Sequence, residues 1–258
     1  MLSKIKGHLA DHPWVDRIHY FETIDSTNTY AKKLAVEGAP AGTVIIADHQ
    51  SAGRGRLGRS FSSPENMGIY LSVILRPDCY PAEMMHLTYA AGLAAVNAIG
   101  EPDVGIKWTN DLVLGKRKLG GILAESSVNH FTNKMSWVVV GIGINCCQRI
   151  SDFPKELQHM ACSLGMHQQD VPALIANLIR QFHQMDRQLL GEKGRIMDSF
   201  REKCITIGSK VSVVRGEDIR HGTAVWVDDD GGLVVEYSDG IETVTSGEVS
   251  IRGMYGYV

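Results

Sequence analysis

Residues 136–145 have the sequence SWVVVGIGIN, which alternates two kinds of side chain. Successive side chains of an extended strand point to opposite faces of a sheet, so one face here is apolar and the other is nearly bare. We interpret the apolar face as the surface beneath packed helices and the bare face as the floor of a pocket. Alternatively, the glycines admit a neighbouring aromatic side chain. The apolar face comprises Val138, Val140, Ile142 and Ile144, and the bare face comprises Val139, Gly141, Gly143 and Asn145.

The flanking segments extend this strand into a sheet covered by helices. Short apolar or alternating runs bounded by turn residues predict further strands, and apolar residues at helical spacing predict helices. A hairpin is expected to turn at Gly115-Lys116. The fold class is therefore α+β with a mixed, mostly antiparallel sheet. Strands are expected at 17–23, 43–47, 68–75, 104–108 and 111–125, and helices from about 29 to 38, over 82–99, over about 171–190 and over 194–203.

The pattern of the chain changes near Ile207. From there we predict five short alternating strands, with turns at 229–232 and 238–240. Short strands with frequent turn signals are typical of a small barrel. The sequence thus predicts two domains, residues 1–206 and residues 207–258.

Composition excludes several classes of protein. The chain has 258 residues, a hydrophobic fraction of 44% and a net charge of −3, which is unlike a nucleic-acid-binding protein with a basic balance. Its five cysteines contain no C-x-x-C pair, which argues against a disulfide framework or zinc site and favours the cytoplasm. We see no signal peptide and no apolar run of the roughly 18 residues that cross a bilayer, so no membrane association is expected.

Residues 53–64, GRGRLGRSFSSP, concentrate positive charge on a flexible segment. The glycines match two phosphate-binding patterns, but both patterns need a helix to begin directly afterwards, and Ser60–Pro64 is a poor helix start. No acidic residue lies between Asp48 and Glu65. A solvated basic turn is one interpretation, but we favour a loop that binds a small anion. Such a loop should be mobile when empty and ordered when occupied.

Two lysines are further candidates for contact with an anion. Lys107 lies opposite the apolar face of its predicted strand, as either an edge-strand charge or a ligand contact. Lys118 is expected to share a face with Gly120, so it is either an anion clamp beside a bare patch or part of a bulge. The turn at 25–28, DSTN, suits the N-terminus of the next helix and can also present hydroxyl and N–H groups to a polar ligand.

Taken together, these motifs resemble the biotin–protein ligase family in order and spacing. Two departures stand out: the family usually has proline where this chain has Thr109, and commonly has tryptophan where it has Phe61. The matching segments are DSTN (25–28), QSAGRGRLGR (50–59), KWTNDL (107–112), KLGGILAE (118–125), VVVGIGIN (138–145) and SGEVSIR (246–252).

The resemblance implies an ATP-dependent ligase with a two-step reaction. Biotin and ATP form biotinyl-5′-AMP and pyrophosphate, and a lysine of a biotin carboxyl carrier protein or domain then displaces AMP. The resemblance also implies a class II synthetase-like fold with helices packed on one side of the sheet, an SH3-like C-terminal barrel and Mg²⁺ as cofactor.

The resemblance assigns roles to individual residues. Lys118, Arg54 and Arg56 are the expected catalytic residues. Biotin is expected to contact Ser26, Thr27, Asn28, Gln50, Arg54, Gly55, Arg56, Lys118 and Gly120. The nucleotide is expected to contact Arg54, Arg56, Arg59, Phe61, Lys107, Asn110, Lys118 and Asn145.

Other functions and partners remain open. A lipoate–protein ligase is the nearest rival, and a non-catalytic nucleotide- or RNA-binding module is a rival of a different class. Only about twenty residues precede the first ligase motif, so we expect no operator-binding domain and no specific DNA binding. A homodimer is possible on the family resemblance.

Overall fold

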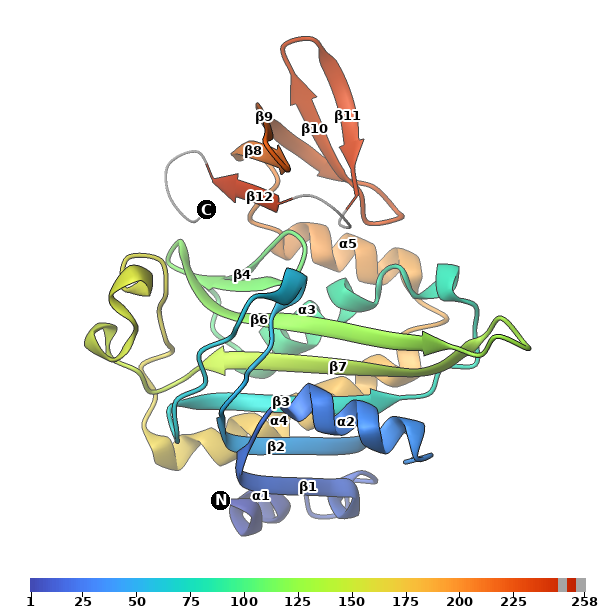
Figure 1. The fold of residues 1–258 in the computed structure, drawn as a ribbon, viewed down its shortest axis with the longest axis vertical. Helices are drawn as coiled ribbons and strands as arrows, with labels where there is room; N and C mark the ends of the chain where they lie inside the picture. Colours follow the sequence, from blue (N-terminus) through green and yellow to red (C-terminus); the bar gives the residue numbers. More distant parts are fainter. Residues whose placement is uncertain (246–249, 254–258) are drawn as a thin grey trace.

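The computed structural model describes residues 1–245 and 250–253, with side chains up to residue 245. Seven strands form one sheet in the order β1-β2-β3-β7-β6-β5-β4, in which only β1 and β2 pair in parallel (Figure 1). The predicted α+β class with a mixed, mostly antiparallel sheet is confirmed. The strands are β1 (Ile18–Ile24), β2 (Thr43–Gln50), β3 (Gly68–Leu75), β4 (Val104–Lys107), β5 (Asp111–Leu114), β6 (Arg117–Val128) and β7 (Met135–Asn145).

The two faces of this sheet bury different sets of apolar side chains. Val138, Val140, Ile142 and Ile144 of β7 belong to the main core, as the alternation predicts. On the opposite face, Val139 belongs to a smaller core. The central strand is therefore buried on both sides along part of its length.

The helices cover both faces of the sheet, which corrects the prediction that they pack on one side. Helix α2 lies against β2, β3 and β7 (Figure 1), and its Ala31 and Ala35 pack in the smaller core. Helices α3 and α4 pack in the main core on the opposite face. The physical reason is that Ile45, Ile74 and Val139 on this face of the strands also need cover. The helices are α1 (Leu2–His8), α2 (Thr27–Val36), α3 (Leu87–Ile99), α4 (Val171–Gln188) and α5 (Lys193–Lys203).

Two helical segments differ from the sequence prediction. The helix expected over 82–99 begins at Leu87, because Pro81–Met84 forms a separate 3₁₀ turn closed by a hydrogen bond from Tyr80 N to the Glu83 carboxylate (2.8 Å). Helix α1 was not predicted, and it packs against α4. The hairpin at 115–116 is confirmed, with β5 and β6 on either side of it.

The C-terminal strands form a second, antiparallel sheet in the order β11-β10-β9-β8-β12. The five predicted strands are confirmed, but closure into a barrel stays a prediction. Residues 246–249 of the motif at 246–252 lie outside the described residues. The strands are β8 (Lys210–Arg215), β9 (Asp218–Val227), β10 (Leu233–Tyr237), β11 (Gly240–Val244) and β12 (Ser250–Gly253).

The chain passes from the large sheet to the small sheet beside β4. Ile205 N donates a hydrogen bond to Ile106 O (3.0 Å), and Ile106 and Cys204 form a parallel bridge. A side chain on Gly105 would come within 2.4 Å of Ile205 Cγ2. The connecting segment therefore covers the edge of the large sheet at β4.

Candidate active site

A cavity of about 590 Å³ lies over the glycine face of β6 and β7. Its size is within the range of sites for small molecules and cofactors. Every predicted site residue except Gly120 lines it. These residues are Ser26, Thr27, Asn28, Gln50, Arg54, Gly55, Arg56, Arg59, Phe61, Lys107, Asn110, Lys118 and Asn145.

The glycines of β7 form the cavity floor and also admit other side chains. A Cβ on Gly141 would lie 2.0 Å from Asn28 Oδ1, and a Cβ on Gly143 would lie 2.5 Å from the Phe61 ring. Both glycines line the cavity. Both interpretations of this strand are therefore correct. Its bare face lines the pocket, and it also accommodates the Phe61 ring and the Asn28 amide.

An uncharged hydrogen-bonding network lies where α2 meets the sheet. The Ser26 hydroxyl accepts from Thr29 N (3.4 Å) and caps the helix, as expected for this turn. Thr27 donates from its backbone N (2.9 Å) and its hydroxyl (3.1 Å) to Gln50 Oε1. Ser72, which the sequence analysis missed, donates its one hydroxyl hydrogen to Asn28 Oδ1 (2.6 Å), and its Oγ lies 2.8 Å from Thr27 Oγ1. These bonds fix the side chains at this end of the cavity.

Glu125 anchors the same region through charge. Its carboxylate accepts hydrogen bonds from Asn28 Nδ2 (3.0 Å) and Lys32 Nζ (2.6 Å), and lies 3.6 Å from Arg54 Nη2. Burial acts to raise the pKa of Glu125, but the bonds from Lys32 and Asn28 outweigh it and hold the pKa below its usual value. Glu125 was quoted within a motif, but its role was not predicted.

The arginine-rich segment forms a tight turn above the cavity. Arg54 and Ser60 bridge its two sides, and Gly55 N donates to Arg59 O (2.7 Å). Gly53 must be glycine, because a Cβ there would lie 2.4 Å from Phe61 O. No α-helix follows this turn before β3, which confirms that neither phosphate-binding helix pattern applies.

Arg56 joins this turn to the wall between β4 and β5. Its Nη1 donates to Thr109 Oγ1 and to Asn110 Oδ1 (2.8 Å for the latter). Asn110 Nδ2 in turn donates to Ile122 O (3.0 Å). Thr109 thus supplies a hydroxyl to the network at the position where the family usually has proline.

Two lysines bring positive charge to the floor. Lys107 is buried, with 6% of its surface exposed, and lines the cavity, so it is no solvated edge-strand charge. Lys118 Nζ donates to Asp111 Oδ1 (2.7 Å). Asp111 is the only acidic residue that lines the cavity in the described part of the chain.

Gly120 requires a correction. A register shift between β5 and β6 pairs Leu112 with Gly120 but Val113 with Lys118, so the alternation of side chains breaks at this point. Gly121 consequently faces Lys118 in the cavity, while a Cβ on Gly120 would lie 2.3 Å from Gly143 O. The bulge that the sequence left open is present.

The segment at 153–162, which follows β7, lines another side of the cavity. The sequence analysis did not predict this contact. Lys118 N donates to Met160 O (2.7 Å), and Cys162 N donates to Lys118 O (2.9 Å). Asn145 Nδ2 donates to Cys162 O (3.0 Å). This segment has no helical or strand periodicity, so only the fold reveals that it holds Lys118 and Asn145.

Asp111, the one acidic residue among the described residues that line the cavity, could hold a metal ion in only one way. Among residues 1–245 and 250–253, no group of three or more His, Cys, Asp and Glu side chains is placed to hold a metal. Mg²⁺ commonly binds proteins through one or two carboxylates and takes its other ligands from water and substrate phosphates. Asp111 fits that arrangement as a single carboxylate.

Residues 20–145 match the biotin/lipoate A/B protein ligase family, and residues 206–252 match the biotin protein ligase C-terminal domain. The chain is 31% identical over 256 residues to the bifunctional ligase/repressor BirA of Bacillus subtilis, covering 96% of this chain and 78% of that protein. It is 33% identical to a biotin–[acetyl-CoA-carboxylase] ligase of Mycobacterium tuberculosis, covering 87% and 85% of the two chains.

The fold is similar to that of a solved structure, the biotin protein ligase from Aquifex aeolicus in complex with biotin and ATP. The TM-score is 0.74 at 27% identity, covering 92% of this chain and 98% of the other. The described part of our chain has no helix with the length and apolar character that a bilayer crossing requires. On the matches in both parts of the sequence, the chain belongs to the biotin/lipoate A/B protein ligase family.

Proposed function

We propose that this protein is a biotin–protein ligase, which activates biotin with ATP and transfers it to a lysine of a biotin carrier protein. Relatives named as biotin ligases support this function, as does the similar Aquifex structure that contains biotin and ATP. The observation in the present structure that carries it is the division of the cavity into an uncharged polar end and a cationic end.

The strand register defines these two ends. Gly141 pairs with Leu123 near Asn28, Gly143 pairs with Gly121 near Lys118, and Asn145 follows at the end of β7. Four residues of strand span about 13 Å. A ligand that lies along this floor meets hydroxyl and amide groups at one end and positive charge at the other.

The uncharged end suits the ureido ring of biotin. This ring offers two N–H donors and a carbonyl acceptor, and the polar side chains at this end carry both donors and acceptors. Ser26, Thr27, Asn28 and Gln50 are the residues that we assign to it. The acyl chain then runs over Gly141 and Gly143 towards Lys118.

The cationic end suits the first chemical step. One oxygen of the biotin carboxylate attacks the α-phosphorus of ATP, the bond to the bridging oxygen breaks, and pyrophosphate leaves. Two anions must approach, so fixed positive charge where they meet lowers the barrier. Lys118 on β6 and Arg56 on the arginine turn supply that charge as proposed catalytic residues. Arg54, which lies near Glu125, is the third proposed catalytic residue, and Gly55 lies between the two arginines on the turn. Substrate phosphates compete with Asp111 for Lys118.

We assign the nucleotide to the cationic end of the cavity floor, near Asn145. Phe61 lies over Gly143 and can stack on adenine, with less area than the tryptophan common in the family. Lys107, Asn110, Asn145 and Arg59 complete the set that we assign to ATP. Bound Mg²⁺ would shield the charge of the phosphates, and Asp111 is the carboxylate that would hold it.

The arginine turn is proposed to protect the intermediate. A mixed anhydride is hydrolysed in open water, and a loop that closes over it excludes water. In the second step, the amine of a carrier lysine attacks the acyl carbon, the bond to AMP breaks, and an amide forms with release of a proton.

Several finer assignments remain predictions. These are a carboxylase carrier domain as the acceptor, a cytoplasmic location, a homodimer, the lack of specific DNA binding, and division into a catalytic domain (1–206) and a small barrel domain (207–258). Size-exclusion chromatography with light scattering tests the homodimer directly.

A transfer assay with two acyl donors tests the proposed function. The protein is incubated with ATP, a biotin carrier domain, and either biotin or lipoate, and the mass of the carrier is measured. We expect a mass increase that corresponds to one biotinyl group and no lipoyl transfer. Transfer of lipoate alone would refute the assignment in favour of a lipoate ligase. A carrier domain whose acceptor lysine is replaced by arginine is the control.

A further inference from the structure

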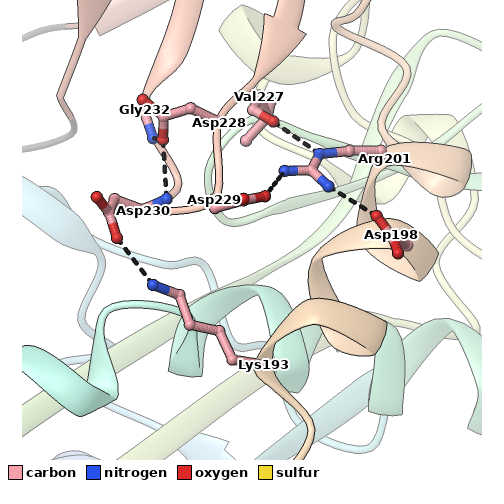
Figure 2. A network of polar contacts seen from close by, with 8 residues as sticks. All are labelled: Lys193, Asp198, Arg201, Val227, Asp228, Asp229, Asp230 and Gly232. Atoms are coloured by element: carbon pink, nitrogen blue, oxygen red, sulfur yellow. Dashed lines mark hydrogen bonds and ion pairs between the residues drawn. The ribbon is translucent and has the colours of Figure 1, made fainter.

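The turn between β9 and β10 of the small sheet is built to hold a fixed shape (Figure 2). The Asp228 carboxylate accepts hydrogen bonds from Asp230 N (3.0 Å) and Gly232 N (2.7 Å). Gly231 has φ +85°, a conformation that favours glycine. We call residues 228–232 the aspartate turn.

The aspartate turn offers one carbonyl to two buried side chains, Tyr89 of α3 and Trp108 directly after β4. Gly231 O accepts from Tyr89 Oη (2.6 Å) and from Trp108 Nε1 (3.0 Å). Only 4% of Tyr89 and 6% of Trp108 is exposed. A Cβ on Gly231 would lie 2.3 Å from the Tyr89 ring, so no larger residue fits without displacing the turn.

Helix α5 holds the flanks of the same turn (Figure 2). Arg201, whose side chain is 9% exposed, donates to Val227 O (2.7 Å) and forms an ion pair with Asp229. Its guanidinium also lies 4.7 Å from the centroid of the Trp226 ring. Lys193 Nζ lies 2.8 Å from Asp230 Oδ1. The turn is thus held by α3, by the segment after β4 and by α5.

Trp108 connects this contact to the active site. It directly precedes Thr109 and Asn110, whose side chains accept hydrogen bonds from Arg56 of the arginine turn. The backbone N of Trp108 donates to Thr206 Oγ1 (2.9 Å), in the segment that leads to the small sheet. Strand β4 contains only four residues. The cavity wall at 107–111 therefore depends on the hydrogen bonds that Trp108 makes to Thr206 and to Gly231 O.

We infer that the aspartate turn is a positioning element for the cavity wall at 107–111, acting through Gly231 O on Trp108 and Tyr89. This inference rests on the proposed function. The wall carries Lys107 and Asn110 of the nucleotide end, whereas the uncharged end is built from α2, β2 and β3. Displacing the turn should therefore weaken the use of ATP and leave the binding of biotin intact.

Gly231→Ala tests this inference, with Gly216→Ala as the matched control. Both glycines have positive φ in turns of the small sheet, but a Cβ on Gly216 would meet nothing within 4 Å. We expect Gly231→Ala to raise the KM for ATP in biotin-dependent pyrophosphate exchange by about tenfold. The Kd of biotin, measured by calorimetry without nucleotide, should stay within about twofold. Gly216→Ala should change neither value.

Tyr89→Phe is the second variant, because it keeps the ring and removes one donor to Gly231 O. It should raise the KM for ATP about threefold to tenfold, the worth of one hydrogen bond. If the Gly231→Ala protein does not fold, the KM for ATP of Tyr89→Phe tests the inference by itself. Unchanged KM for ATP in Tyr89→Phe, or equal losses in Gly231→Ala and Gly216→Ala, would overturn the inference. An inactive wild-type protein would instead refute the proposed function.

Discussion

At the scale of single residues, the sequence predicted part of the environment of Lys118 but not all of it. Its role in the site was predicted from the family resemblance, whereas the pattern of a lysine beside glycines left an anion clamp and a bulge both open. Its partner Asp111 and the neighbouring Gly121 were not predicted, because the bulge between β5 and β6 changes which residues share a face. A period-two pattern carries no information on where a bulge shifts the register.

Glu125 is the residue whose role the structure adds most clearly. It joins Asn28 and Lys32 of α2 to Arg54 of the arginine turn. Nothing near position 125 in the sequence points to these partners. Only the pairing of β6 beside β7, with α2 packed across them, brings the four side chains together.

Glu125→Gln should lower the melting temperature by a few degrees near neutral pH, since partly exposed ion pairs contribute about 1 kcal/mol. The pKa of Glu125 is lowered in the folded protein, so its stabilisation is present above the usual value of 4.5 and is lost as the pH falls through the folded value. The difference in melting temperature between the two proteins should therefore shrink in acid. Calorimetry over a pH series measures it.

The control for this variant is Glu65→Gln, which alters an exposed glutamate on the flank of the arginine turn. It should leave the melting temperature nearly unchanged. A Glu125→Gln protein as stable as wild type near pH 7, or a difference that grows in acid, would show that Glu125 is no anchor.

At the scale of elements, the strands and most helices follow from periodicity. The β7 alternation predicted both the core face and the cavity floor, and the hairpin at 115–116 was placed correctly. The prediction that all helices pack on one side of the sheet was wrong for α2. A helix pattern shows that one side of the helix is apolar but not which face of the sheet that side meets. The segment around 153–162 has no periodicity at all, so its contact with Lys118 was beyond prediction.

The arginine turn is the element whose behaviour is easiest to test. Trypsin cleavage after Arg54, Arg56 or Arg59 should slow at least several-fold when biotin and ATP are both present, because an anion that bridges the guanidiniums orders the segment. Limited proteolysis followed by mass spectrometry gives the rates. Cleavage after Lys134, in the loop between β6 and β7, is the internal reference. Equal rates at the arginines with and without ligands would contradict closure of this turn.

At the scale of the whole molecule, the sequence indicated two parts but not how they meet. Five short strands after Ile207 were expected, and a second sheet is present. The docking of the aspartate turn on Tyr89, Trp108 and α5 depends on a backbone carbonyl and on the path of the connecting segment. Neither has a sequence pattern, whereas the Asp-Asp-Gly-Gly composition predicts only a turn.

The most direct test of the central claim is ATP–pyrophosphate exchange. Because we propose that the biotin carboxylate and the α-phosphate of ATP meet beside Lys118, labelled pyrophosphate should enter ATP only when biotin is present. Lys118→Ala should reduce the exchange rate by about 100-fold or more, and Lys33→Ala, on the exposed side of α2, should not. Exchange that needs no biotin, or full exchange in Lys118→Ala, would contradict the account.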